Sequence, residues 1–402
     1  MSPPQLDLRV IRMLLADWFA RLAREAGLKL DQYGTGGKGY TLGAPSEFNV
    51  TAKFIEERPF LQFLASDANL QELVNKIAQQ AVTRVDAGDY GSITWYSVSL
   101  ATECASPFSM GTFVQQLGSQ TRIVGWRRLG SDILIEFTEE LPVDLEKKNT
   151  PFAPKAVAHI HIAVPSPCAG HFSSYIAHSA TETVAAICTF ALGRPINLPP
   201  SVFPTSPERL PDLNSRRTDT TVLTLARKHV SLDFFSQVVV SGGLEHFARM
   251  RAAFLTFDAA IQQQHDSVAC ILYVVAAEVL STPNSAWRDT KLTKRFIDFF
   301  TELMPSTLDQ IVAHGNFEGA FGISRGTRTS LALRRELLEQ IYDFRSGHLH
   351  AGLRPSYRGI FFGLDESSDE IRRILIADFA EGAILGYLAS PRSSLIGYPK
   401  FS

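Results

Sequence analysis

Cysteine is scarce in this chain, with only four residues in 402. Cys104, Cys168, Cys188 and Cys270 are scattered and form no C-x-x-C pair. The chain therefore lacks the cysteine pattern of a disulfide scaffold. We expect four reduced thiols, as in a cytoplasmic protein.

The chain also has little net charge and no long apolar run. The formal charge is -2 and the isoelectric point is about 6.6, so a broad basic surface for nucleic acid is not expected and any RNA contact must be local. The longest apolar run, 268–277, is far shorter than the roughly 20 residues of a membrane span. The first residues lack the basic start and apolar run of a signal peptide. We predict a cytoplasmic protein without a membrane contact.

The hydrophobic pattern divides the chain into three segments and predicts an α+β fold. Residues 1–194 form a mixed domain with an antiparallel sheet, 195–240 a proline-rich linker and bridging segment, and 241–402 an all-helical domain. In the first segment we expect helices over 6–28, 69–85 and 181–192, and strands over 92–100, 132–138 and 156–164.

Two groups of residues in the first segment are of types that often bind ligands, but neither matches a known binding motif. The glycine-rich stretch Tyr33–Tyr40 lacks the spacing of a phosphate-binding loop and is interpreted as a flexible turn. Four histidines, His159, His161, His171 and His178, match no established metal-ligand spacing. We expect neither a metal nor a cofactor.

The helical domain contains one strongly apolar helix, predicted over 268–280, with helices before it over 245–264 and after it up to Pro305. A glycine-rich loop over 315–329 follows, then a helix from Ser330 and a last helix opened at 367–370. Glu278 is the only charged residue of the apolar helix, so burial obliges it to pair with a cation.

The helix from Ser330 contains the candidate site residues. Its predicted apolar face contains Leu331, Leu338, Ile341, Tyr342 and Leu349. Arg345 lies on the same face and needs an anion or carbonyl groups as partners. His348 and His350 stand near the expected end of the helix, on either side of Leu349.

Arg345-Ser-Gly-His-Leu-His350 resembles the signature of the HEPN superfamily, an arginine, four to six residues and a histidine. The Ile-Tyr-Asp-Phe before it and the small residues after it are similar to the Apea-like HEPN branch of bacterial anti-phage and toxin-type proteins. One departure is that Ala351 stands between the histidine and Gly352. The resemblance implies an antiparallel helical bundle that pairs as a homodimer, binds RNA and cleaves it without a metal, in antiviral defence, abortive infection or growth arrest.

Roles for the site residues follow from this resemblance. Arginine offers a permanently charged fork for phosphate and histidine moves protons near neutral pH, so we assign Arg345 to the phosphate and His350 to proton transfer. Ser346 or His348 would bind the substrate or orient His350, and Tyr342 would support the site. Glu278 would orient Arg345, since Apea-like sequences carry a similar glutamate before a leucine.

Two alternatives stay open. In a continuous helix, position 350 lies about 140° around the axis from position 345, while position 348 is much closer. Either Gly347 ends the helix and His350 turns back, or the histidine acts across a twofold dimer interface. The second alternative concerns function: Arg345 and Glu278 are structural, and the domain is a non-catalytic module for dimerisation or nucleic-acid binding. The first domain would sense a phage or cellular trigger or select the RNA.

Overall fold

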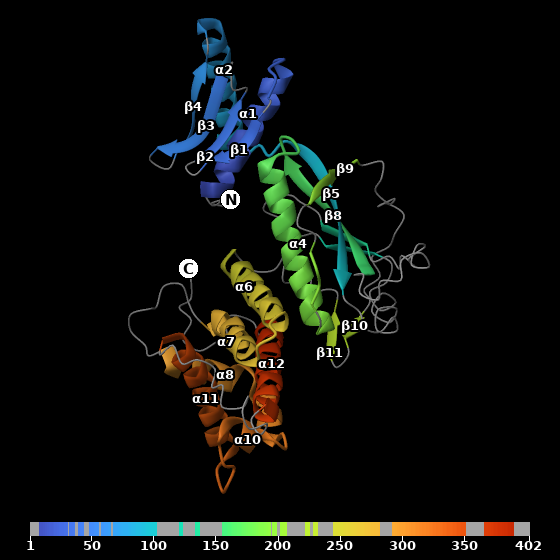
Figure 1. Cartoon of the computed structure of the whole chain (residues 1–402), viewed down its shortest axis with the longest axis vertical. Coiled ribbons are helices and arrows are strands. Elements are labelled where there is room, and N and C mark those ends of the chain that lie inside the picture. The colour runs from blue at the N-terminus through green and yellow to red at the C-terminus, as the bar shows by residue number, and fades with distance from the viewer. Residues whose placement is uncertain are drawn as a thin grey trace. The chain divides into compact units, whose positions relative to one another are not determined.

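The computed structural model describes residues 8–30, 32–36, 39–43, 48–55, 58–65, 67–102, 120–123, 133–136, 155–193, 195–198, 202–206, 222–225, 228–231, 244–281, 292–350 and 366–389. Contacts divide the chain into two units. The N-terminal unit comprises Met1–Glu182 with Asn197–Leu223, and the helical unit comprises Thr183–Ile196 with Thr224–Ser402. Figure 1 shows strands concentrated in the first unit and helices in the second, so the chain is α+β as predicted.

The N-terminal unit begins with helix α1 and an antiparallel four-stranded sheet in the order β1-β2-β3-β4. The bounds are α1 Leu8–Glu25, β1 Gln32–Gly36, β2 Gly39–Gly43, β3 Phe48–Ile55 and β4 Arg58–Ala65. The sequence interpretation of 33–40 as a flexible turn is wrong, because Tyr33 pairs with Leu42 and Gly36 with Gly39 in a β-hairpin. The glycines did not prevent strand pairing here, although they weaken the strand signal.

Helices α1 and α2 (Ala68–Asp86) contact each other, and both contact this sheet. The apolar stripe of α1 is buried as its spacing predicts, with Leu14, Leu15 and Phe19 at 1% exposure or less. Asp67 caps α2 by accepting a hydrogen bond from the Leu70 amide at 2.8 Å. Both helices were predicted from sequence within three residues at each end.

A second antiparallel sheet has the order β6-β7-β8-β5-β9. Helix α4 follows β8 in the chain and precedes β9. The bounds are β5 Ser92–Thr102, β6 Gln120–Ile123, β7 Ile133–Glu136, β8 Lys155–Ser166, α4 His171–Leu192 and β9 Phe203–Thr205. Two predictions need correction. Helix α4 begins ten residues before the predicted Thr181, and the proline-rich segment supplies β9, which pairs with β5 through Ser97 and Phe203.

Asp17 of α1 joins the first helix to the start of α4. Its carboxylate accepts hydrogen bonds from the His171 and Phe172 amides, both at 3.0 Å, while the Cys168 thiol donates to its backbone oxygen. These amides belong to the first turn of α4, where backbone donors lack partners within the helix. A carboxylate from a distant helix therefore caps α4.

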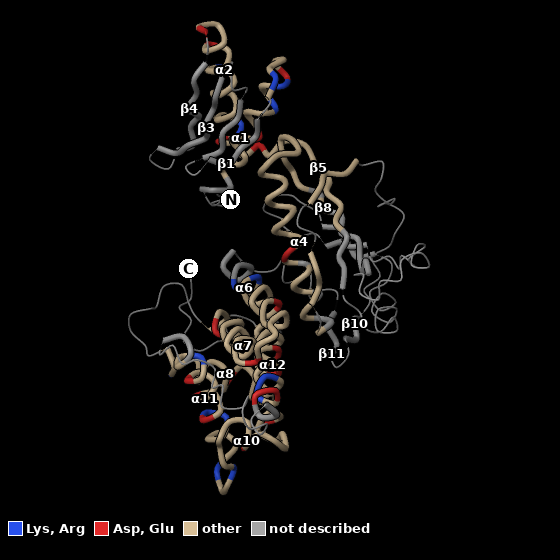
Figure 2. The backbone as a smooth tube through the Cα atoms, viewed as in Figure 1, with Lys and Arg blue, Asp and Glu red and all other residues tan. Residues whose placement is uncertain are grey.

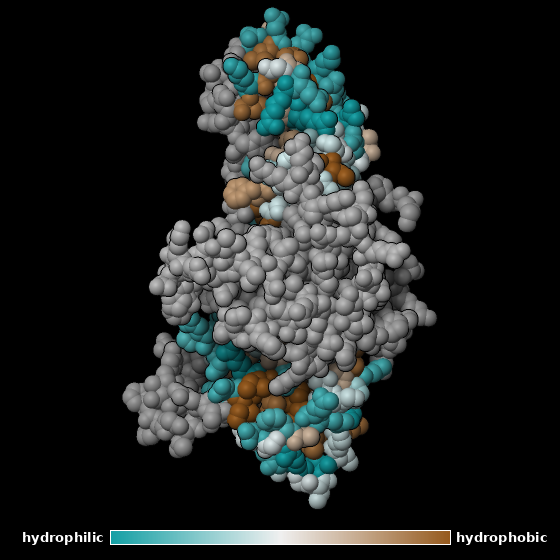
Figure 3. Space-filling model, turned by 90° about the vertical axis from the view of Figure 1, so that its right-hand side faces the viewer, coloured by the Kyte–Doolittle hydropathy of each residue, from teal (hydrophilic) through white to brown (hydrophobic). Residues whose placement is uncertain are grey.

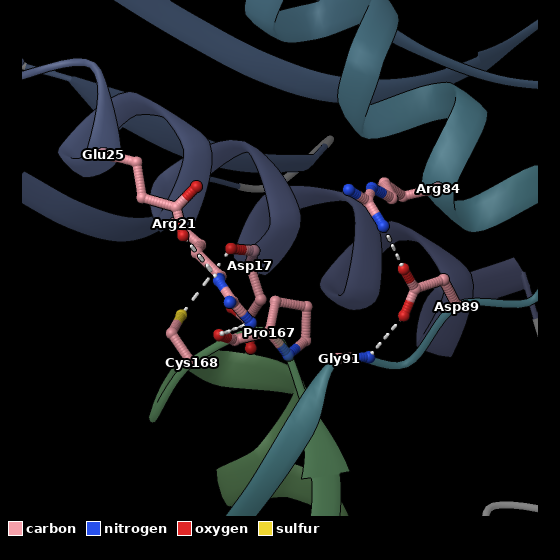
Figure 4. Close-up of polar contacts among 8 residues, drawn as sticks. All are labelled: Asp17, Arg21, Glu25, Arg84, Asp89, Gly91, Pro167 and Cys168. Atoms are coloured by element: carbon pink, nitrogen blue, oxygen red, sulfur yellow. Dashed lines mark hydrogen bonds and ion pairs between the residues drawn. The ribbon is translucent and has the colours of Figure 1, made fainter.

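A second carboxylate, that of Asp89, holds the turn between α2 and β5, as Figure 4 shows. Asp89 accepts from Arg84 at 2.7 Å and from the Gly91 amide at 2.8 Å. A Cβ at Gly91 would lie 2.7 Å from the Ser166 carbonyl oxygen, and its φ of 83° is one that side chains disfavour. Glycine is therefore required where β5 begins beside the end of β8.

We expect Asp17→Ala to lower the free energy of unfolding by about 2–4 kcal/mol, because it leaves two helix-terminal amides without their carboxylate. Urea denaturation followed by tryptophan fluorescence would measure the change. Glu25→Ala on the same helix is the control, since its ion pair with Arg21 is exposed and should contribute less than about 1 kcal/mol. Equal, small changes in both variants would contradict the capping role.

The helical unit has a central helix, α7, which contacts α6, α8, α11 and α12. Its buried side chains include Ala269, Tyr273, Val274 and Leu280, which confirms the prediction of a buried central helix. The bounds are β10 Val222–Leu225, β11 Lys228–Ser231, α6 Leu244–Ile261, α7 Asp266–Ser281, α8 Leu292–Leu303, α9 Pro305–Ala313, α10 Phe317–Phe321, α11 Ser330–His350 and α12 Glu366–Ala389.

The sequence prediction missed two helices of this unit. Helix α8 ends at Leu303, just before Pro305 as expected, but Pro305 also stands at the first position of the missed helix α9. Proline is well tolerated there because its missing amide hydrogen would have no partner within the helix. The predicted loop over 315–329 contains the short helix α10, and Arg325 of that segment donates to the Val312 carbonyl at the end of α9.

The C-terminal half of α4 packs in the helical unit. Phe190 makes edge contacts with Phe254 and Phe257 of α6, at ring-centroid distances of 5.2 and 5.1 Å. The boundary between the two units falls between Glu182 and Thr183, whereas the sequence predicted a domain boundary after residue 194.

The surface of the helical unit combines ion pairs with exposed apolar residues. Figure 2 shows acidic and basic positions close together on its helices. Ion pairs include Arg335 with Asp298 and Arg373 with Asp266, both at 2.7 Å. Figure 3 shows hydrophobic surface bordered by hydrophilic surface on one face of this unit. Across the described residues, no helix is both long and apolar enough to cross a membrane.

Candidate active site

The candidate site is built where α11 crosses the end of the central helix α7. Arg345 of α11 and Glu278 of α7 form an ion pair, with 2.8 Å between Nη2 and Oε2. Their side chains are only 18% and 14% exposed. The pairing expected from the lone charge on the apolar helix is therefore present.

Tyr342 lies one turn before Arg345 and supports the guanidinium. The Arg345 Cζ atom is 5.8 Å from the centre of the Tyr342 ring, within the range of a cation–π contact. The ring packs against Phe296 of α8 at a centroid distance of 5.2 Å, and the Thr293 side chain of α8 is a polar neighbour of its hydroxyl. The guanidinium is thus bracketed by a carboxylate and an aromatic ring, which restrict its orientation.

Burial sets the electrostatics of the pair. It raises the pKa of Glu278, and the neighbouring Arg345 charge offsets this only in part. The pKa of Tyr342 is also raised, mainly by burial and further by the Glu278 charge. Tyr342 therefore stays protonated at neutral pH and can only donate or accept a hydrogen bond there.

Arg345 keeps donor capacity beyond the ion pair. Its Nε atom is buried and has no hydrogen-bond partner among the described residues. A guanidinium carries five N–H groups, and the observed contact uses one nitrogen, Nη2. The remaining donors suit a ligand with several acceptor oxygens, such as a phosphate.

The backbone of α11 continues through Gly347 to His350. The alternative in which Gly347 ends the helix is therefore wrong; glycine inside a helix costs only about 1 kcal/mol relative to alanine. Within one chain, position 350 lies about 140° around the axis from position 345, and position 348 about 60°. The side chains of His348, Leu349 and His350 lie outside the described residues, whereas Ser346 is half-buried beside Arg345.

The apolar face of α11 is shifted from the predicted one. Leu331 is 51% exposed, and Leu333 and Leu337 are buried instead, together with the predicted Leu338 and Ile341. Leu331 lies in the first turn of α11. Sequence reasoning also missed Thr293 and Phe296 as supports of Tyr342, because neither stands at a position that the Arg-x4-His pattern marks.

Other chemistries find little support in the part of the chain that the structure describes. It contains no group of three histidine, cysteine or acidic residues that could hold a metal. Burial raises the pKa of Cys168 and Cys270 to about 12, so neither thiol is a thiolate nucleophile at neutral pH.

The raised pKa of Glu278 gives a pH prediction. A carboxyl group that binds its proton more tightly when folded contributes stability at low pH and loses it as the pH rises through its folded-state pKa. Glu278→Gln lacks this titration, so the stability of wild type relative to the variant should fall as the pH rises above about 4.5. Urea denaturation of both proteins between pH 4 and pH 8, roughly spanning that window, measures it. A difference that does not change, or that grows in favour of wild type, would contradict the burial effect.

Comparison with known proteins adds no assignment. No family model, no curated protein and no solved structure matches this chain. The likeness to HEPN sequences therefore depends on the residues around Arg345 and on the helices that hold them.

Proposed function

We propose that the helical unit is a metal-independent endoribonuclease of the HEPN type, acting in anti-phage defence or growth arrest. The observation that carries this proposal is the half-buried Arg345, held by Glu278 and Tyr342 within an Arg-x4-His sequence. An arginine fixed in this way is suited to a phosphate whose charge grows during reaction.

The proposed reaction needs only groups that the chain supplies. The ribose 2'-hydroxyl attacks the adjacent phosphorus, a 2',3'-cyclic phosphate forms, and the 5'-oxygen leaves with a proton. Arg345 stabilises the charge on the phosphate oxygens, and His350 transfers protons because imidazole titrates near neutral pH. Ser346 and His348 bind substrate or orient the catalytic imidazole.

The continuous helix favours a site shared between two chains. Since positions 345 and 350 face different sides of α11, Arg345 of one copy would work with His350 of a second copy in a twofold dimer. His348, closer to Arg345 around the helix, is the alternative proton carrier within one chain. The N-terminal unit would select RNA or respond to a phage or cellular trigger.

Mixing two inactive variants distinguishes these arrangements. Arg345→Ala and His350→Ala proteins, dissociated and reassociated together, should regain about a quarter of wild-type cleavage. Half of randomly formed dimers are mixed, and each mixed dimer carries one intact site. Cleavage of labelled RNA in EDTA is the readout, with each variant alone as the control.

The other outcomes are equally informative. If His350→Ala cleaves normally and His348→Ala does not, the proton carrier is His348 and the His350 assignment is wrong. If both Arg345→Ala and His350→Ala are inactive alone and stay inactive after mixing, the site is contained in one chain.

A further inference from the structure

A groove between α9 and α12 lies apart from the Arg345 site. It has a volume of about 580 Å³, within the usual range of small-ligand sites. Its lining includes the apolar side chains of Leu303, Leu375 and Leu385, together with a smaller number of polar ones. Apolar walls with a few polar groups are typical of sites for small organic ligands.

The two helices approach closely because α12 carries glycine at positions 382 and 386. A Cβ at Gly382 would lie 2.6 Å from the Thr307 side chain of α9, and one at Gly386 would lie 3.2 Å from Leu303, the last residue of α8. The start of α9 is therefore fixed against the later part of α12. The groove follows both helices from this contact, with Gln310 and His314 contributed by α9 and Asp378 by α12.

Asp378 is the only acidic residue in the lining, and no lysine or arginine accompanies it. Neither Asp378 nor Gln310 has a hydrogen-bond or ion-pair partner within the described residues. A carboxylate has two acceptor oxygens, and the Gln310 amide has both donors and an acceptor. A ligand that fits must donate hydrogen bonds to Asp378.

His314 adds a donor. Its Nδ1 atom accepts a hydrogen bond from the Asn316 amide at 3.3 Å, so the neutral imidazole carries its hydrogen on Nε2. An ammonium or guanidinium ligand would satisfy Asp378 but has no acceptor for His314 or for the Gln310 amide. The ligand must therefore present neighbouring donors and an acceptor on one molecule.

From these groups we propose that the groove binds a guanine base. The Watson–Crick edge of guanine has two adjacent N–H donors, which match a carboxylate, and its O6 atom accepts from His314 or Gln310. Adenine places an acceptor where guanine has N1–H, which opposes Asp378. The base comes either from a free nucleotide or from single-stranded RNA, and both present the same edge.

Calorimetric titration of the full chain with GMP, AMP and agmatine tests the proposal. GMP should bind wild type at least about tenfold more tightly than AMP, and Asp378→Asn should weaken GMP at least about tenfold, since it replaces one acceptor by a donor. Glu370→Gln, at an exposed position of α12 outside the groove, loses the same charge and should bind GMP as wild type does. Gln310→Ala, also at an exposed position, should weaken GMP about threefold or more and guards against misfolding of Asp378→Asn.

An RNA arm separates the two sources of the base. Fluorescence anisotropy with short single-stranded RNAs that contain or lack guanine should show Asp378-dependent binding only for the first, if RNA is the source. Equal binding of GMP and AMP, binding of agmatine alone, or indifference to Asp378→Asn with every probe would overturn the proposal. So would the absence of binding by every probe. These readouts do not use RNA cleavage, so their failure leaves the proposal for Arg345 untouched.

Discussion

Arg345→Ala is expected to reduce RNA cleavage at least about a hundredfold, the usual cost of removing one group that stabilises charge in a transition state. Arg345 is the only member of the candidate site with a permanent positive charge, and its guanidinium is held by Glu278 at 2.8 Å. Initial rates on a labelled RNA in EDTA, compared with those of wild type, measure the effect. Arg345→Lys should recover only part of the rate, because an ammonium lacks the planar fork.

The same helix supplies a matched control. Arg334 lies on α11, is 19% exposed compared with 18% for Arg345, and pairs with Asp309 of α9. Arg334→Ala therefore also removes a half-buried arginine and its ion pair, but three turns from the site. It should keep most of the activity. Equal losses in Arg334→Ala and Arg345→Ala would show that the effect comes from the fold and not from the phosphate contact.

Phe296→Ala is expected to lower the free energy of unfolding by about 3–5 kcal/mol, as for other large-to-small changes of buried aromatic residues. Phe296 is 1% exposed and contacts Phe300 at 4.8 Å, Tyr342 at 5.2 Å and Phe379 at 5.8 Å. Its loss leaves a cavity among α8, α11 and α12. Urea denaturation followed by circular dichroism at 222 nm, the far-ultraviolet helix band, measures the change.

Ile374→Ala on α12 is the control for this variant. Ile374 is 50% exposed, so its truncation should change stability by less than about 1 kcal/mol. Because Tyr342 packs on Phe296 and supports Arg345, Phe296→Ala should also reduce cleavage under conditions where it remains folded. A Phe296→Ala protein as stable as Ile374→Ala would contradict the assignment of this ring to the core.

Periodicity predicted the helices whose apolar stripe is complete. Helix α1 was found because its buried residues recur at helical spacing along the whole element, and the central helix α7 because it is apolar on nearly all sides. The start of α4 was missed because His171, Ser173 and Ser174 obscure the stripe and the cap comes from Asp17, 154 residues away from His171. Distant caps of this kind leave no local signal.

A feature of the site could be predicted only where nearby residues in the sequence indicate it. A cationic partner for Glu278 was predicted because a single charge on an apolar helix requires one, and the resemblance to HEPN sequences pointed to Arg345. The course of α11 past Gly347 was not, since one glycine neither ends nor preserves a helix by itself. The support of Tyr342 by Phe296 depends on how α8 packs on α11, which residue spacing does not specify.

The chemistry of the ends that wild-type protein leaves on RNA tests the central claim most directly. Total cellular RNA is incubated with the purified full chain in EDTA, and the new termini are identified. We predict 2',3'-cyclic phosphate or 3'-phosphate ends opposite 5'-hydroxyl ends, formed despite the chelator and absent with Arg345→Ala. Cleavage that requires a divalent metal, or that leaves 3'-hydroxyl and 5'-phosphate ends, would contradict the proposed mechanism.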